Sequence, residues 1–165
     1  MQQRRRPDDP DRHGFDENRD YLGELLGTLV PVRLARAAVT LSLSLPREEF
    51  GLDEPVPFTV EIRNRLPVPV TVPTPRLRLW GWAVDGQVEA TDEATFASDR
   101  PGQLELDGRE TKRISRTWDG RFERSDGGPN GRSEWVLPER GRHELSAFVA
   151  TDPPCASDSV TFELR

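Results

Sequence analysis

From residue 37 onward, apolar and polar residues alternate in short stretches that turn residues interrupt. In 37–45 every second residue is apolar, and 56–64 repeats the pattern. A period of two puts alternate side chains on opposite faces of a strand, and many short strands separated by turns are typical of antiparallel sandwiches and barrels. We therefore expect an all-β fold, an antiparallel immunoglobulin-like β-sandwich of eight or nine strands, with a closed barrel as the alternative.

The expected strands are short and evenly spaced, and turn residues close most of them. Asp85-Gly86 is a strong two-residue hairpin signal, and Pro67, Pro69 and Pro73 assign the strand that contains them to a sheet edge, because proline cannot donate to a ladder. The segments that carry the strand pattern are 37–45, 56–64, 66–74, 75–84, 87–91, 103–106, 110–118, 143–151 and 158–165.

The N-terminal part lacks this alternation. Residues 1–19 carry few apolar side chains, with an arginine triplet at 4–6 followed by acidic residues, so we expect a disordered tail. Leucines at helical spacing predict a short amphipathic helix within 20–36, with Pro31 as its stop. The helix either docks on its own sandwich or binds a partner or membrane surface. The sandwich domain is expected over 37–165.

The charge balance narrows the possible partners. The chain has 23 basic and 29 acidic residues, a net charge of -6, and every basic residue except Lys112 is arginine. This composition resembles salt-adapted, halophilic proteins, and codon bias is the equal alternative. An acidic chain without a dominant basic stripe argues against nucleic acid as a partner. No apolar run approaches the length of a membrane span, and no apolar segment follows the N-terminal arginines, so we expect a cytoplasmic protein.

No constellation of catalytic residues is recognisable. The two histidines, His13 and His143, have no partner at metal-ligand spacing, and His143 is expected at the rim of the core. Cys155 is the single cysteine, so neither an internal disulfide nor a cysteine metal cluster can form, and no base that would activate it is visible. We predict a protein that is not an enzyme and has no cofactor and no metal.

Two segments are candidates for a binding surface. In 75–86, PRLRLWGWAVDG, strand alternation would put Arg76, Arg78, Trp80 and Trp82 on one face. The glycine-rich stretch 119–135, expected as a long loop, contributes Arg121, Phe122 and Arg124.

Exposed tryptophan and arginine anchor interfaces, whereas buried tryptophan fills cores, and both interpretations of Trp80 and Trp82 stay open. The leading functional hypothesis is a non-catalytic module that binds another protein. A carbohydrate or small-ligand module that stacks its ligand on Trp80 and Trp82 is a further alternative.

A family resemblance covers about residues 50–152. The segments 58–72, 104–120 and 137–151, with Asn64 ending a strand and Trp118-Asp119 ending another, run in the order seen in the BsuPI-type intracellular proteinase inhibitor family. The turns at 108–110 and at Gly141 occupy matching places, whereas His143 stands where that family tends to have an aromatic residue. The resemblance implies an immunoglobulin-like sandwich and adds proteinase inhibition as an alternative function, with no inhibitory residue carried over.

Overall fold

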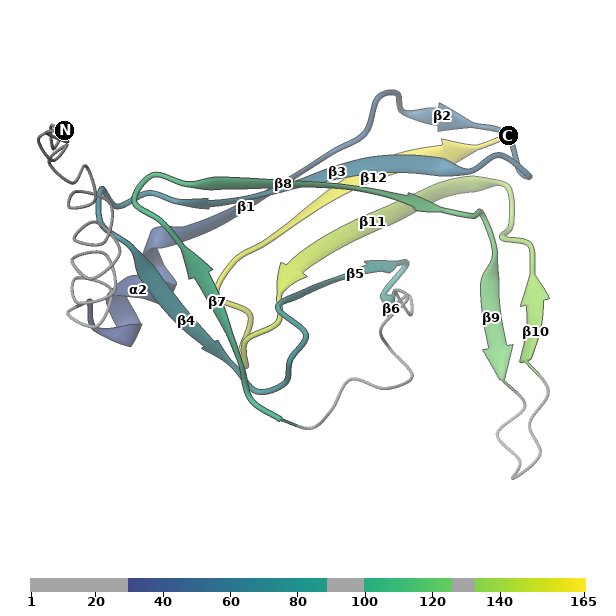
Figure 1. Cartoon of the computed structure of the whole chain (residues 1–165). Helices are drawn as coiled ribbons and strands as arrows, with labels where there is room; N and C mark the ends of the chain where they lie inside the picture. Colours follow the sequence, from purple (N-terminus) through teal and green to yellow (C-terminus); the bar gives the residue numbers. More distant parts are fainter. Residues whose placement is uncertain (1–29, 89–99, 126–132) are drawn as a thin grey trace, which may run out of the picture.

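The polypeptide forms an all-β, immunoglobulin-like β-sandwich whose described strands pair antiparallel, except for the short strand at 49–50, which runs parallel to its neighbour (Figure 1). The computed structural model describes residues 30–88, 100–125 and 133–165. One sheet has the strand order β1 (Val39–Ser44), β3 (Val56–Asn64), β8 (Thr111–Trp118). The facing sheet has the order β2 (Glu49–Phe50), β12 (Ser157–Leu164), β11 (Gly141–Val149), β5 (Trp80–Val84), β6 (Gln87–Val88).

Two further strand pairs complete the described strands. The first joins β4 (Val70–Thr74) to β7 (Gly102–Leu106), whose buried apolar residues belong to the same core. The second joins β9 (Phe122–Ser125) to β10 (Ser133–Val136). The described residues therefore contain twelve strands, more than the eight or nine expected. The excess comes from the two-residue strand β2 and from β9 and β10, which begin within the stretch 119–135 that we expected to be a loop, whereas β6 lies in the expected strand 87–91.

The core lies between the two sheets and follows the predicted alternation. In β3 the buried residues are the even-numbered ones, and β1 contributes Val39, Leu41 and Leu43. Phe58 of β3 and Trp82 of β5 meet across the interior, with their ring centroids 5.0 Å apart. Trp118, only 1% exposed, closes one end of this core. The inward-facing positions predicted for 37–45 and 56–64 are confirmed from Val39 onward.

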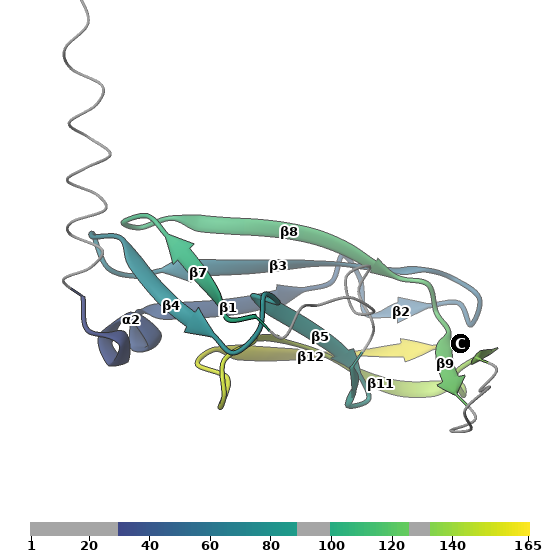
Figure 2. The same ribbon diagram turned by 60° about the horizontal axis from the view of Figure 1, so that its bottom comes forward.

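Along one side of the molecule, β1 of the first sheet lies beside β12 of the second (Figure 2). The Leu43 N–H donates a hydrogen bond to Asp158 Oδ2 at 2.9 Å, so a carboxylate on one sheet satisfies a backbone donor of the other. β8 forms the opposite margin of the first sheet, and β3 is its partner strand.

The helix before the sandwich begins where we expected it to end. α2 (Val32–Ala38) starts directly after Pro31, whose carbonyl accepts hydrogen bonds from the N–H groups of Leu34 and Ala35. Proline is tolerated at a helix start because its missing N–H has no intrahelical partner there. Pro31 is therefore the N-cap of α2, a role that we did not assign to it, and the first strand begins at Val39 instead of Ala37. The tail 1–19 and most of the helix predicted within 20–36 lie outside the described residues.

Candidate functional site

The two tryptophans of 75–86 lie on the inner face of their sheet. β5 pairs with β11 so that Trp82 stands opposite Ala147 and Trp80 opposite Val149, both buried residues of the interior. Trp82 is 5% exposed and packs against Phe58. A ring buried to this degree offers no face to a sugar, so Trp82 belongs to the core and not to a binding surface or a stacking platform.

The glycine between these tryptophans has its own packing reason. Gly81 faces the outside of the sheet, and a Cβ built there would lie 2.8 Å from the ring of Phe148 on the neighbouring strand. The absence of a side chain lets the Phe148 ring lie across β5. In the W-G-W sequence, the two tryptophans therefore face inward, and the outward-facing Gly81 is covered by the ring of Phe148.

The expected face of two arginines and two tryptophans does not form as one strand surface. β5 begins only at Trp80, and residues 75–79 are irregular, with the Thr74 hydroxyl donating to the Arg76 carbonyl at 2.6 Å. Alternation therefore does not extend back to Arg76 and Arg78. The guanidinium over the half-buried Trp80 ring belongs to Arg116 of β8, with its Cζ 5.8 Å from the ring centroid.

The second candidate segment leaves the sandwich through a tight turn after Trp118. Gly120 has a φ of 76°, which favours glycine, and the Arg121 N–H donates to Asp119 Oδ1 at 3.1 Å. The Trp118 indole Nε1–H then donates to the Arg121 carbonyl at 3.0 Å, and the Phe122 ring lies 5.2 Å from that of Trp118. Arg121 is exposed, but the half-buried Phe122 anchors the following strand on the core.

The loop 51–54 packs behind this turn and is held by hydrogen bonds of its own. The Gly51 N–H donates to the Glu54 carboxylate at 3.0 Å, and this hydrogen bond, followed by that from Arg47, lowers the pKa of Glu54. A Cβ at Gly120 would lie 3.3 Å from the Glu54 carbonyl oxygen. The loop at 51–54 therefore backs the turn from which β9 departs.

We name β9, β10 and Leu137 the arm. Its strands pair antiparallel, with Phe122 opposite Val136 and Glu123 opposite Trp135, and they extend away from the sandwich (Figure 1). Trp135 is 54% exposed and Leu137 is 43% exposed, although both are large and apolar. Arg124 lies in β9, and its side chain is outside the described part of the chain.

Sequence reasoning included Trp135 in the candidate stretch 119–135, at the end of an expected loop, but did not select it individually as a binding residue, and it did not consider Leu137. A signal was present, because RFERS and SEWV flank a segment rich in glycine with Pro-Asn, which is the composition of a strand, a turn and a strand. Recognising a hairpin there would have pointed to its aromatic residue.

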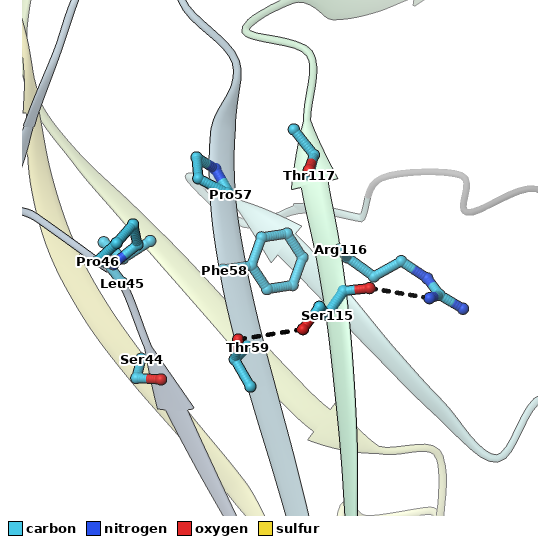
Figure 3. Close-up of a pocket in the computed structure, with 9 residues that line it drawn as sticks. All are labelled: Ser44, Leu45, Pro46, Pro57, Phe58, Thr59, Ser115, Arg116 and Thr117. Atoms are coloured by element: carbon cyan, nitrogen blue, oxygen red, sulfur yellow. Dashed lines mark hydrogen bonds between the residues drawn. The ribbon is translucent and has the colours of Figure 1, made fainter.

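A shallow groove of about 490 Å³ opens on the outer face of the first sheet, between the ends of β1, β3 and β8 (Figure 3). It exists because β1 leaves the sheet after the pair Ser44 and Thr59. In the same register Pro46 would stand opposite Pro57, and neither residue has an N–H to continue the ladder. The lining side chains are mainly hydroxyls and proline rings, with Arg116 as the single ionisable group among them.

His143 is a structural residue at the rim of the core, as expected. It is 8% exposed, with Nδ1 2.6 Å from Asp85 Oδ2 and Nε2 2.8 Å from the Glu139 carbonyl oxygen. Asp85, with a φ of 50°, and Gly86 form the predicted hairpin turn between β5 and β6. Because both ring nitrogens already face protein acceptors, His143 is not available to a substrate.

Other chemical groupings are sparse in the described segments. Over residues 30–88, 100–125 and 133–165, no three histidine, cysteine or carboxylate side chains gather as metal ligands would. In the same segments, no helix combines the length and apolar character needed to cross a membrane. Cys155 is half-buried with a free thiol.

Comparison with protein families gives one assignment. Residues 27–165 match a family of unknown function, DUF7974. The chain belongs to this family. The match covers the sandwich and the arm together, and the proteinase-inhibitor resemblance stays a prediction from sequence. No curated protein matches the chain.

Several solved structures resemble this DUF7974 member. A β-glucosidase from Listeria innocua in complex with laminaribiose is 16% identical, with 77% of this chain and 16% of that chain covered and a TM-score of 0.47. A β-glucosidase from Erythrobacter marinus is 11% identical, with 77% of this chain and 15% of that chain covered and a TM-score of 0.49. The CARDB domain of PF1109 from Pyrococcus furiosus, in complex with di-metal ions, is 10% identical, with 76% of this chain and 91% of that chain covered and a TM-score of 0.47.

The chain spans about a sixth of the length of the β-glucosidases it matches. Similarity at these levels carries no argument about activity or ligands.

Proposed function

We propose that this DUF7974 chain is a non-catalytic β-sandwich module that binds another protein through its arm. The observation that carries the proposal is the exposure of Trp135 and Leu137 on a strand pair that projects from the sandwich. Tryptophan is enriched among the residues that dominate binding energy, so an exposed tryptophan on a projecting strand pair is a candidate anchor for a partner.

The attachment of the arm supports this role. Phe122 packs on Trp118, and the Trp118 indole is hydrogen bonded to the Arg121 carbonyl, so the base of the arm is fixed before any partner arrives. A fixed base reduces the conformational entropy lost on binding. An arm built in this way can present Trp135 at low entropic cost.

The chemistry of the described residues also favours binding over catalysis. His143 is engaged through both ring nitrogens, and the hydroxyl-lined groove has no neighbouring base among its lining residues. An acyl-transfer or hydrolytic site needs a nucleophile next to a base. The proposal therefore assigns function to the surface of the arm.

The test is quantitative co-purification of the full chain from its native cells, followed by titration with the recovered partner. The variant Trp135→Ala should weaken binding on the order of 100-fold, because burying the exposed half of a tryptophan contributes about 3 kcal/mol. Leu77→Ala is the matched control, since Leu77 is 51% exposed but lies outside the arm. A partner whose affinity is unchanged by Trp135→Ala, or equally lowered by Leu77→Ala, would contradict the proposal.

A further inference from the structure

Strand β8 is an eight-residue edge strand that leaves half of its backbone groups unpaired among the described residues. It pairs with β3, and no other described strand pairs with it (Figure 2). The Asn64 N–H donates to the Glu110 carbonyl at 2.9 Å, so Glu110 is a residue whose backbone bonds to β3. In an antiparallel pair only every second residue bonds to its partner strand. The backbone groups of the residues between them therefore point away from β3, namely those of Thr111, Arg113, Ser115 and Thr117. Such an edge can accept another strand.

The charge of β8 is opposite to that of the chain. Lys112, Arg113 and Arg116 are exposed, and 111–118 contains no acidic residue, in a chain of net charge -6. Arg113 is neutralised by Glu61, to which its Nε–H donates at 2.8 Å. Positive charge therefore remains on Lys112 and Arg116.

The contacts of these two residues do not neutralise them. Lys112 Nζ donates to the Glu105 carbonyl at 2.7 Å, and Arg116 donates to the Ser115 carbonyl at 3.0 Å. Neither forms an ion pair with a carboxylate of the described residues. Both are exposed cations beside the open edge of the sheet.

The positions of the cations disfavour a second copy of the chain as the occupant. Lys112 and Arg116 stand opposite Ile62 and Phe58, on the inward-facing side of the sheet. If two β8 strands paired antiparallel about Ile114, Lys112 of each copy would face Arg116 of the other. Like charges directly opposite one another are destabilising, and inward charges on an edge strand oppose pairing between copies.

We propose that the free edge of β8 binds an extended acidic segment of a partner protein as an added strand. The backbone groups at the four outward positions would pair with the segment, and its carboxylates would contact Lys112 and Arg116. Arg116 would release the Ser115 carbonyl to a backbone donor of the segment. The cations that oppose self-pairing thus select the partner. This surface is separate from the arm and stands independently of the function proposed for it.

The experiment measures fluorescence anisotropy of a labelled, capped nine-residue peptide in which glutamate alternates with valine, titrated with the full chain at about 50 mM salt. The matched peptide carries lysine in place of glutamate. Ser115→Pro removes an outward N–H, and Ser115→Val keeps that N–H while also removing the side-chain contact with Thr59. The double variant Lys112→Glu/Arg116→Glu reverses the charge, and Arg33→Glu/Arg142→Glu reverses two exposed arginines elsewhere.

We expect the glutamate peptide to bind and the lysine peptide not to bind. Ser115→Pro and the Lys112/Arg116 reversal should each weaken binding at least tenfold, while Ser115→Val and the Arg33/Arg142 reversal change it less than about twofold. In the unmutated chain, the peptide should slow hydrogen exchange at the amides of Thr111, Arg113, Ser115 and Thr117. No binding of the glutamate peptide, equal affinity of Ser115→Pro and Ser115→Val, or unchanged exchange at these amides would overturn the proposal.

Discussion

Replacing Asn64 should be among the most damaging single changes to this sandwich. Asn64 is fully buried at the end of β3, and its Nδ2 donates to the carbonyls of Val68 and Asp107, each at 2.8 Å. Its Oδ1 accepts the Leu66 N–H at 2.9 Å. One side chain therefore ties the end of β3 to the turn before β4 and to the turn between β7 and β8.

The magnitude follows from these contacts. Three short hydrogen bonds contribute about 1 kcal/mol each, and backbone groups left unsatisfied in a buried site add more, so Asn64→Ala should lower the free energy of unfolding by about 3–5 kcal/mol. Asn64→Asp keeps the shape and the acceptor but faces a carboxylate with two carbonyls, so it should cost at least as much at neutral pH.

Urea denaturation, followed by tryptophan fluorescence, measures both effects. Arg63→Ala is the control, because the side chain next to Asn64 in β3 is exposed and its loss should cost less than about 0.5 kcal/mol. If Asn64→Ala cost less than 1 kcal/mol, or if Asn64→Asp were tolerated, the two turns would not depend on the amide and the reasoning would fail.

Two further changes test the packing. Trp118→Phe should cost about 1–2 kcal/mol more than Trp82→Phe in the same urea assay. The reason is that the Trp118 Nε1–H has an acceptor, whereas the buried Trp82 Nε1–H has none among the residues that the structure describes. Equal costs would contradict this. Gly108→Ala should lower the free energy of unfolding by about 1–3 kcal/mol, since its Cβ would lie 2.2 Å from the Pro67 carbonyl oxygen, and calorimetry showing an unchanged unfolding temperature would refute the turn geometry.

The fold was predictable from sequence where one local rule decided the outcome. Alternation identified the inward residues of β1 and β3, and Asp85-Gly86 identified a hairpin, because period and turn chemistry are local properties. Pro31 was considered only as a helix end, whereas it also caps the start of α2, since proline is well tolerated before a first helical turn. The helix after Pro31 was not predicted because it depends on packing against the sandwich, which Ala35 and Ala38 provide.

The candidate site was less predictable because it depends on where strands begin and end. Alternation over 75–84 assumed a continuous strand, but β5 starts at Trp80, so the arginine over Trp80 comes from β8, far away in sequence. Trp82 could be assigned to the core only once β5 was known to pair with β11, which places Trp82 opposite the buried Ala147. The sequence of one strand does not specify which strand pairs with it. The exposure of Trp135 similarly required knowing that β9 and β10 project from the sandwich.

The hydrogen bond between Leu43 and Asp158 joins the two sheets on the side where β1 lies beside β12. On the other side, β8 ends the first sheet, and its inward positions alternate between the cations Lys112 and Arg116 and the apolar residues Ile114 and Trp118. On this side the contacts between the sheets are made by side chains: the Trp118 ring lies 6.0 Å from that of Phe162 in β12, and Arg116 lies over Trp80 of β5. The two sheets are therefore joined by a hydrogen bond to a backbone N–H on one side and by the packing of aromatic rings on the other.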